Sequence, residues 1–325
     1  MSAPILSVEN LRIVFDTRHG ELTAIDGVSL DIAPGEILGV VGESGAGKSL
    51  TGTAIIGLLD PPGRIAGGTI RLEGERIDNL PPEAMRKVRG RRIGAIFQDP
   101  LTSLHPMLTI GDQLVETIMT HLPLDRRAAR ARAVELLGEV GIPSPDMRID
   151  QHPHQFSGGM RQRVVIALAL AGEPKLIIAD EPTTALDVSI QAQITTLLKR
   201  LCRERGAAVM LVTHDMGVIA ETADRVAVMY AGRIIETGPV EAVTRRALHP
   251  YARGLMASIP SLRERRDMLR QIDGAMPRLN AIPPGCAFNP RCGYATEQCR
   301  AEQPALGNEP HAAACWHPLT GEARG

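Results

Sequence analysis

Aromatic side chains make up only 2% of this 325-residue chain, which has 1 Trp, 3 Tyr and 4 Phe. Few aromatic rings leave few platforms for stacking single-stranded bases, and a formal net charge of −1 argues against a broadly basic surface. No apolar run is long enough to cross a bilayer, and the start lacks the basic and apolar regions of a secretory signal. These deficits disfavour a nucleic-acid-binding class. They predict a soluble, cytoplasmic chain that reaches a membrane only through partners.

Cysteine is also scarce, and its distribution is uneven. Of 5 cysteines, 4 lie near the C-terminal end, at Cys286, Cys292, Cys299 and Cys315. Structural disulfides are not expected in a cytosolic protein, so a metal centre is the better explanation for clustered thiols. The spacing C-x₅-C-x₆-C-x₁₅-C lacks the short pairs typical of zinc sites and favours a [4Fe–4S] cluster, with Zn²⁺ and unligated buried thiols as alternatives. Cys202 falls on an apolar helical stripe and is expected to be a buried small hydrophobe.

Glycines gather between an apolar run and a periodic apolar segment. Residues Ile37 to Val41 predict a buried strand, and apolar residues at 55, 56, 58 and 59 predict a helix that runs through Leu59. Glycines let successive backbone N–H groups surround an anion, and a helix N-terminus adds its positive end. We therefore predict a nucleotide site, with Lys48 on the β- and γ-phosphates and the Ser49 hydroxyl on Mg²⁺. The loop matches GxxxxGK[ST] and reads Gly42-Glu43-Ser44-Gly45-Ala46-Gly47-Lys48-Ser49.

A second set of polar residues follows the apolar strand expected at 176–179. Asp180 and Glu181 come directly after this strand, where Asp180 can hold the water shell of Mg²⁺ and Glu181 can polarise an attacking water. Upstream, the segment Phe156-Ser157-Gly158-Gly159-Met160 precedes an expected helix and offers a hydroxyl and bare backbone N–H groups to an anion. The chain thus has two candidate phosphate-binding loops, which need not serve the same nucleotide.

The remaining pattern predicts an α/β fold. Alternating apolar residues at 6–15 and 24–32 indicate an antiparallel β-rim. Between about 100 and 155 the pattern is helical, with Asp125 as the expected cap of an amphipathic helix. Composition shifts after about residue 255, where several prolines exclude one long helix or sheet. Further strands are expected at 67–74, 93–97, 208–213, 225–230 and 233–236, and further helices at 161–171 and 190–203.

The types of motif in this chain and their order along the sequence resemble those of the nucleotide-binding subunit of an ATP-binding cassette (ABC) transporter. The resemblance implies a P-loop NTPase fold with an antiparallel β subdomain, a helical subdomain at about 100–160 and a small cysteine-containing extension. It also implies ATP and Mg²⁺ as ligands and ATP hydrolysis as the activity. The matching motifs are Walker A at 42–49, the Q-loop residue Gln98, the signature at 156–160, Walker B ending at Asp180, the following Glu181, the D-loop at 185–187 and the switch residue His214.

The resemblance assigns roles to individual residues. Catalysis falls to Glu181, His214, Gln98 and Lys48, and Mg²⁺ coordination to Ser49, Gln98 and Asp180. In this family two subunits pack head to tail, so Ser157, Gly158 and Gly159 contact the nucleotide held by the other subunit's Walker A loop. Leu50 completes the Walker A contacts, and Phe15 is the expected adenine-stacking residue, with His19 as the alternative.

Two longer stretches narrow the resemblance to the dipeptide, oligopeptide and nickel importer branch. These are residues 98–106, QDPLTSLHP, and 152–159, HPHQFSGG, and the tail from Pro284 through the four cysteines is similar as well. The chain looks like a "D"-type peptide import ATPase, and this resemblance also favours the [4Fe–4S] cluster. Two positions depart from the pattern. Met160 stands where the general signature has glutamine, and His105 stands where this branch often has asparagine.

The resemblance implies import of di- and oligopeptides at the cytoplasmic face of the bacterial inner membrane. The implied partners are a second homologous ATPase, two transmembrane permeases and an extracytoplasmic solute-binding protein, without nucleic acid. We expect a nucleotide-binding domain at 1–255 and an extension at 256–325. Import of nickel or another small solute is the alternative within the branch. A soluble ABC ATPase acting on nucleic acid is disfavoured because no sustained heptads occur, and an iron–sulfur redox module with a regulatory ATPase is a third hypothesis.

Overall fold

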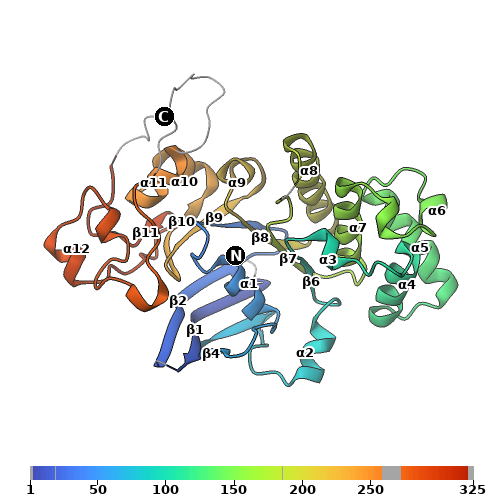
Figure 1. Ribbon diagram of the computed structural model, residues 1–325, viewed down its shortest axis with the longest axis horizontal. Coiled ribbons are helices and arrows are strands. Elements are labelled where there is room, and N and C mark those ends of the chain that lie inside the picture. The colour runs from blue at the N-terminus through green and yellow to red at the C-terminus, as the bar shows by residue number, and fades with distance from the viewer. Residues whose placement is uncertain (1–2, 19, 185, 258–271, 321–325) are drawn as a thin grey trace. The chain divides into compact units, whose positions relative to one another are not determined.

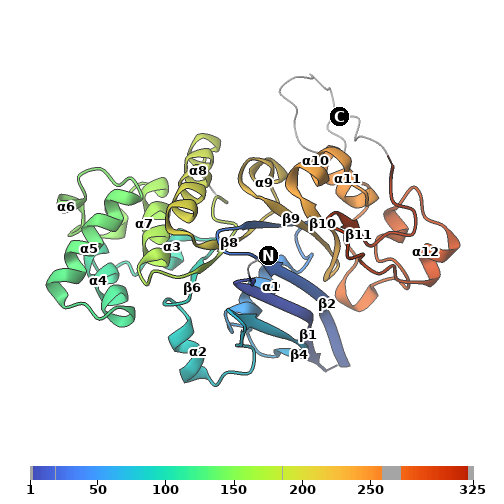
Figure 2. The ribbon, with the colours of Figure 1, turned by 180° about the vertical axis from the view of Figure 1, so that it is seen from behind.

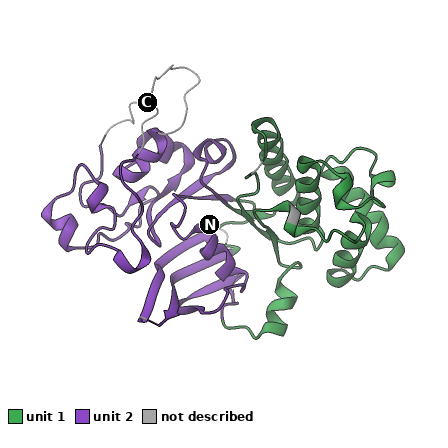
Figure 3. Ribbon diagram, viewed as in Figure 1, with its two compact units in different colours: residues 1–5, 32–36, 79–211 green, residues 6–31, 37–78, 212–325 purple. Residues whose placement is uncertain are grey.

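The computed structural model describes residues 3–18, 20–184, 186–257 and 272–320. The chain forms two compact units, which Figure 3 colours separately. Unit 1 contains residues 1–5, 32–36 and 79–211, and unit 2 contains residues 6–31, 37–78 and 212–325. Each unit combines segments that are far apart in the sequence. The predicted domain boundary after residue 255 is a different division and stays a prediction.

Unit 2 contains the predicted antiparallel β-rim. Its four strands have the order β2-β1-β4-β5, and β1 pairs with β4 from Leu6 opposite Leu72 to Phe15 opposite Gly63. Alternation places Leu6 and Val8 in the core and leaves Glu9 exposed, and a register shift after Glu9 moves the buried positions to Leu11 and Ile13. The strands are β1 (Leu6–Thr17), β2 (Gly20–Ile32), β4 (Gly63–Leu72) and β5 (Glu75–Arg76).

A second set of strands in unit 2 positions the glycine loop. All 5 residues of β3 (Ile37–Val41) are buried, as the apolar run predicts. This strand pairs in parallel with β9 (Arg225–Tyr230). Strand β9 forms the predicted hairpin with β10 (Arg233–Pro239), and β10 pairs with β11 (Ala312–Ala313) from the C-terminal segment. The C-terminal segment is therefore joined by hydrogen bonds to the sheet that carries the loop.

The helices of unit 2 are short, and the first is shorter than predicted. Helix α1 ends at Ile55 because Gly57 adopts a left-handed φ of 64° and its N–H donates to the Ala54 carbonyl, as at many helix C-termini. Leu58 lies beyond this end and is 41% exposed, so the predicted extension through Leu59 is wrong. Helices α10 and α11 pack together in both ribbon views (Figures 1 and 2). The helices are α1 (Lys48–Ile55), α9 (Met216–Thr222), α10 (Val240–Arg246), α11 (Pro250–Ala257) and α12 (Glu297–Ala301), with 3₁₀ turns η2 (Leu279–Ala281) and η3 (Asn289–Arg291).

Unit 1 combines parallel strands with helices. Strand β6 (Ile93–Ile96) pairs in parallel with β7 (Leu176–Asp180), from Ile93 opposite Leu176 to Ile96 opposite Ala179. Residues 208–211 of β8 (Ala208–Thr213) also belong to this unit. The helices are α2 (Pro82–Val88), α3 (Pro100–Ser103), α4 (Ile110–His121), α5 (Arg126–Glu139), α6 (Pro145–Arg148), α7 (Gly158–Leu170) and α8 (Val188–Arg205), with the 3₁₀ turn η1 (Pro153–Gln155).

The helical insertion is confirmed. The Asp125 carboxylate accepts a hydrogen bond of 2.7 Å from the Ala128 N–H and caps α5. The predicted apolar stripe is fully buried where α5 packs against α4 and α7 (Figure 1); it comprises Ala129, Ala133, Leu136, Leu137 and Val140. Cys202 is buried on α8, as predicted. Among the helices that the structure describes, none combines the length and hydropathy needed to span a membrane.

Candidate active site

The loop between β3 and α1 in unit 2 has the predicted shape of an anion cradle. Gly42 has φ 153° and Gly47 has φ 102°. A Cβ atom at Gly42 would lie 2.3 Å from the Met229 carbonyl oxygen, and one at Gly47 would lie 2.4 Å from Ile25 Cδ1. Only glycine fits either position. The loop leads directly into the N-terminus of α1, where backbone N–H groups and the helix dipole favour an anion.

Lys48 lies at the start of α1 and closes this loop. Its side chain is buried, and Nζ donates to the carbonyl oxygens of Gly42 at 2.8 Å and Glu43 at 3.1 Å. The ammonium group is therefore held over the first turn of the loop. Ser49 is exposed beside it, and Leu50 is half-buried. A buried cation beside a loop in which Ser44 and Gly45 are exposed suits a phosphate.

In unit 1, the end of β7 places a carboxylate in a fixed orientation. Glu181 Oε2 accepts a hydrogen bond of 3.1 Å from Gln98 Nε2 and one of 2.8 Å from Thr184 Oγ1. Gln98 follows β6, which pairs with β7, so the parallel register brings these residues together. Asp180 is the last residue of β7 and is half-buried.

The backbone of Glu181 is strained. Its φ of 47° lies in the left-handed region. A non-glycine residue there costs on the order of 1–3 kcal/mol, and such residues cluster at functional sites. The strain and the two side-chain hydrogen bonds together indicate a carboxylate whose direction is functionally important.

The second predicted loop caps α7 in unit 1. Ser157 is the N-cap residue, and its Oγ accepts a hydrogen bond of 3.4 Å from the Met160 N–H. Ser157 and Gly158 are exposed, whereas Phe156 is buried and anchors the turn. A Cβ atom at Gly159 would lie 2.9 Å from Ile190 Cγ2 on α8. The exposed N-terminus of a 13-residue helix is available to an anion from outside unit 1.

The other predicted site residues are placed as follows. His214 is exposed after β8, and the neighbouring Asp215 caps α9 by accepting a hydrogen bond of 2.8 Å from the Gly217 N–H. Phe15 is half-buried, with its ring over Gly63. His19 and Ala185 lie outside the described residues.

The four clustered cysteines line one small cavity in unit 2. All four thiols are free. Burial raises the pKa of Cys286 and Cys292 and raises the pKa of Cys315 to about 11. These three thiols are therefore protonated at neutral pH unless a metal displaces their protons. Within the described residues, no group of three or more His, Cys, Asp or Glu side chains is arranged to hold a metal ion.

A buried histidine lines the same cavity. His249 is 1% exposed, and burial lowers its pKa to about 3, so the imidazole is neutral. Nδ1 accepts a hydrogen bond of 3.1 Å from the Tyr251 N–H, which leaves the proton on Nε2. Nε2 has no hydrogen-bond partner in the part of the chain that the structure describes. A buried donor without an acceptor is costly, so this cavity favours a ligand with an acceptor atom.

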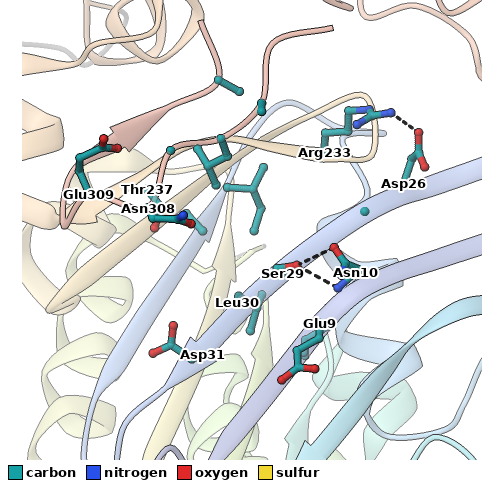
Figure 4. A pocket seen from close by; sticks show the side chains of 18 of the residues that line it. Glu9, Asn10, Asp26, Ser29, Leu30, Asp31, Arg233, Thr237, Asn308 and Glu309 are labelled. Carbon is teal, nitrogen blue, oxygen red and sulfur yellow. Dashed lines mark hydrogen bonds and ion pairs between the residues drawn. The ribbon is translucent and has the colours of Figure 1, made fainter. Parts of the chain in front are cut away.

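A larger cavity in unit 2, of about 720 Å³, contains none of the predicted site residues (Figure 4). It is lined by β1, β2, β9, β10 and the segment 303–309. Its walls are tied together by an ion pair between Asp26 and Arg233 and by a hydrogen bond of 2.9 Å from the Asn10 N–H to Ser29 Oγ. The size of a cavity alone therefore does not identify the candidate active site in this chain.

Sequence reasoning missed several residues at these sites, His249 among them. Thr184 holds Glu181, and its spacing of three residues from Glu181 was a usable signal. Tyr251 and Arg291 contact Glu43 of the glycine loop from 208 and 248 residues away in the sequence. No local pattern could have indicated contacts of that range.

Comparison with known proteins agrees with the order of these motifs. Residues 25–184 match the family model described as ABC transporter, and residues 235–299 match the oligopeptide/dipeptide transporter C-terminal region. A "Putative peptide import ATP-binding protein" of Brucella abortus (strain 2308) is 48% identical over 305 residues, which cover 94% of this chain and 92% of the relative. A second protein of that description from the same strain is 49% identical over 326 residues, which cover 96% of each chain.

The chain belongs to the ABC transporter family. Solved structures support the same assignment. The ATP-binding cassette MJ0796, as a dimer in a post-hydrolysis state bound to ADP and Pi, has a TM-score of 0.65 and 29% identity, covering 72% of this chain and 98% of that chain. The protein cbiO1 from Clostridium perfringens, part of the ABC transporter complex cbiONQ, has a TM-score of 0.65 and 30% identity, covering 74% and 91%. As an ABC family member, this chain is an ATPase with the predicted cassette fold.

Proposed function

We propose that this chain is the ATP-hydrolysing subunit of an importer for di- and oligopeptides. The relatives described above carry the name of peptide import ATP-binding proteins, and residues 235–299 match the C-terminal region of oligopeptide and dipeptide transporters. The observation that best supports hydrolysis is the geometry of Glu181 at the end of β7. Its backbone is strained, and its carboxylate accepts hydrogen bonds from Gln98 and Thr184. A nickel importer of the same branch is the alternative.

The chemistry follows from these side chains. Backbone N–H groups of residues 42–49 bind the phosphates, and Lys48 exchanges its bonds to loop carbonyls for bonds to phosphate oxygens, neutralising charge as the γ-phosphoryl group leaves. Glu181 orients the attacking water, and His214 contacts the γ-phosphate. Ser49, Gln98 and Asp180 supply hydroxyl, amide and carboxylate oxygens, the donor types that Mg²⁺ prefers. Phe15 stacks on the adenine.

Head-to-tail pairing with a second ATPase subunit explains the second loop. Ser157 and Gly158 are exposed at the N-terminus of α7, ready to bind the γ-phosphate held by a partner's Walker A loop. Met160 replaces the glutamine of the general pattern, so the contact depends on Ser157 and the two glycines. The dimeric state of the related cassette MJ0796 supports this arrangement.

A permease helix is the proposed occupant of a groove in unit 1. The groove of about 450 Å³ is lined by Phe97, Thr102 and Ser103 on either side of Gln98, and by Val165, Leu168 and Ala169 of α7. Phe97 is 43% exposed there, an apolar ring suited to a partner's apolar side chain. Through two permeases the chain would sit at the cytoplasmic face of the bacterial inner membrane and serve a solute-binding protein, with the nucleotide-binding domain at 1–255 and the extension at 256–325.

The cysteine cavity is the proposed site of a [4Fe–4S] cluster, with Zn²⁺ as the alternative. Four thiols line the cavity, and four thiolates are the ligand set of such a cluster. The unpartnered Nε2–H of His249 fits as well, because ligated sulfur accepts hydrogen bonds. Among the described residues, no three such side chains are arranged around one metal position, and a cluster, which is larger than one ion, accepts ligands that lie farther apart. When bound, it would supply a structural crosslink or a redox sensor.

Metal analysis tests this assignment. Protein purified anaerobically should be brown, contain iron and acid-labile sulfide, and lose both in Cys292→Ser. Cys202→Ser is the matched control, because Cys202 is buried on α8 in unit 1, and it should keep both. A colourless protein with one zinc per chain would refute the cluster and leave the ATPase assignment intact.

Solute uptake tests the proposed function. A strain that lacks this chain should lose growth on defined di- and oligopeptides as its sole amino-acid source, and the wild-type gene should restore growth while Lys48→Ala should not. Nickel uptake, measured in the same strains, should be unchanged. Loss of nickel uptake with normal growth on peptides would favour the alternative solute.

A further inference from the structure

The Walker A loop is held from outside by residues of the C-terminal segment. Glu43, the second residue of the loop, is half-buried, and its Oε2 accepts a hydrogen bond of 3.1 Å from Arg291 Nη1 in an ion pair. The backbone N–H of Glu43 donates a hydrogen bond of 2.8 Å to the Tyr251 hydroxyl. The carboxylate and the backbone N–H of Glu43 are therefore both bound by residues of the region that matches the oligopeptide/dipeptide transporter C-terminal model.

Arg291 is built to hold a fixed position. Its side chain is only 7% exposed. Nε donates 2.8 Å to the Asp273 carbonyl, and Nη2 donates to the carbonyls of Ile272 at 3.3 Å and Gly274 at 3.2 Å. Nη1 also donates 3.4 Å to the Tyr230 hydroxyl. Because several acceptors fix the guanidinium, it cannot move together with the Glu43 carboxylate. It therefore restrains the position of Glu43.

Tyr251 belongs to an aromatic cluster that stiffens the second contact. Its ring packs edge to face on Tyr230, with centroids 4.7 Å apart, and lies 5.4 Å from Phe288. All three rings are buried. The hydroxyl that accepts the Glu43 N–H therefore belongs to a cluster of three packed aromatic rings, in a chain that has few aromatic residues.

Arg291 and Tyr251, the two residues that contact Glu43, are both close in sequence to residues that line the cysteine cavity. Arg291 directly precedes Cys292 in the sequence; Arg291 is the last residue of the 3₁₀ turn η3, and Cys292 is its C-cap. Tyr251 donates its backbone N–H to His249, and His249 and Phe288 line the cavity with the four thiols. The two residues that contact Glu43 are therefore next to residues that line the cysteine cavity.

We propose that Arg291 and Tyr251 are positioning residues for ATP binding, which hold the Walker A loop through Glu43. This inference rests on the proposed nucleotide site but does not depend on which metal the cysteines bind. The predicted consequence is a loop preorganised for phosphate, so that loss of the restraint weakens nucleotide binding before it affects the fold.

A double-mutant cycle tests the proposal on the full chain, with mant-ATP as the fluorescent probe. Arg291→Gln and Glu43→Gln should each weaken binding by about tenfold, and the double variant should be no weaker than either single variant, since both remove one interaction. Arg291→Lys should restore part of the affinity. Tyr251→Phe, which keeps the ring and removes only the hydroxyl, should weaken binding by about threefold. Arg76→Gln is the matched control, because it breaks an ion pair with Asp78 elsewhere in unit 2 and should leave affinity unchanged.

The outcomes separate the inference from the proposed function. Wild-type protein that fails to bind mant-ATP overturns the nucleotide site and the inference with it. Wild-type binding with an unchanged Arg291→Gln variant overturns only the inference. A loss in Arg291→Gln that adds fully to the loss in Glu43→Gln also overturns it, because Arg291 would then act through its other contacts. The midpoint of thermal unfolding, measured on every variant, should not follow the order of the binding losses.

Discussion

Glu181, which we propose orients the attacking water, has a carboxylate that is already held in one orientation in this structure. Two hydrogen bonds fix one oxygen, and the left-handed backbone fixes the direction of the side chain. A carboxylate oriented in advance stabilises the attacking water without reorganisation during the reaction.

Replacing this carboxylate by an amide should separate binding from hydrolysis. Glu181→Gln should bind ATP with wild-type affinity and lower kcat by about 10²–10³-fold, because the amide no longer orients the water as a negative charge does. The measurement is ATP turnover in an assembled complex whose companion ATPase carries the equivalent change. Glu204→Gln, at an exposed glutamate on α8, is the control and should retain full turnover. Undiminished hydrolysis in the doubly changed complex would refute the assigned role.

Thr184 should act as a positioning residue for Glu181. Thr184→Val keeps the side-chain shape but removes the hydroxyl that donates to Oε2 at 2.8 Å. Loss of a hydrogen bond to a charged group costs roughly 1.5–3 kcal/mol, so kcat should fall by about tenfold or more. Affinity for ATP should stay constant, since the hydroxyl acts on the Glu181 carboxylate and is not among the groups proposed to bind phosphate. The equivalent change at the exposed Thr196 on α8 should alter neither quantity, and equal loss of kcat and affinity in Thr184→Val would contradict the role.

At the residue scale, the sequence predicts groups whose chemistry depends on local spacing. Lys48 and the loop glycines were predicted from one short pattern, and Asp180 and Glu181 from their place after an apolar strand. Arg291 and Tyr251 were not, because their contacts with Glu43 form only when distant segments meet. His249 was missed for the same reason. Its significance comes from burial and an unpartnered Nε2, which no spacing reveals.

At the element scale, periodicity predicted the regular segments well. The apolar run of β3 and the stripe of α5 were both confirmed, because burial on one face requires that pattern. The end of α1 was predicted wrongly because apolar residues continue beyond Gly57, while the left-handed glycine ends the helix. The short turns of the C-terminal segment have no periodicity and were not predicted individually.

The cap of α5 should contribute to stability without affecting the active site. Asp125→Ala removes the acceptor for the Ala128 N–H and should lower the free energy of unfolding by about 1 kcal/mol. Asp125→Asn is the matched control, because asparagine is an equally good N-cap residue, and it should be close to wild type. Urea unfolding measures both variants, and mant-ATP affinity should be unchanged in each. A normal free energy of unfolding in Asp125→Ala would show that the cap does not contribute.

At the scale of the whole molecule, the chain has the parts of an ATPase that works with partners. The Walker A loop and the residues that contact its Glu43, Tyr251 and Arg291, lie in unit 2, whereas the signature loop and Glu181 lie in unit 1. We propose that the exposed Ser157 and Gly158 bind another subunit's nucleotide and that the groove lined by Phe97 receives a permease helix. We therefore expect the purified chain alone to hydrolyse ATP slowly.

The most direct test is the rate of ATP hydrolysis at saturating ATP in the importer assembled in lipid vesicles. The companion ATPase, the permeases and peptide-loaded binding protein are added to this chain in turn. We expect a low rate from the chain alone, an increase on assembly, a further increase with peptide, and loss of activity when this chain carries Lys48→Ala and the companion carries the equivalent change. Full turnover by the isolated chain, or a complete complex whose rate does not respond to peptide, would contradict the account.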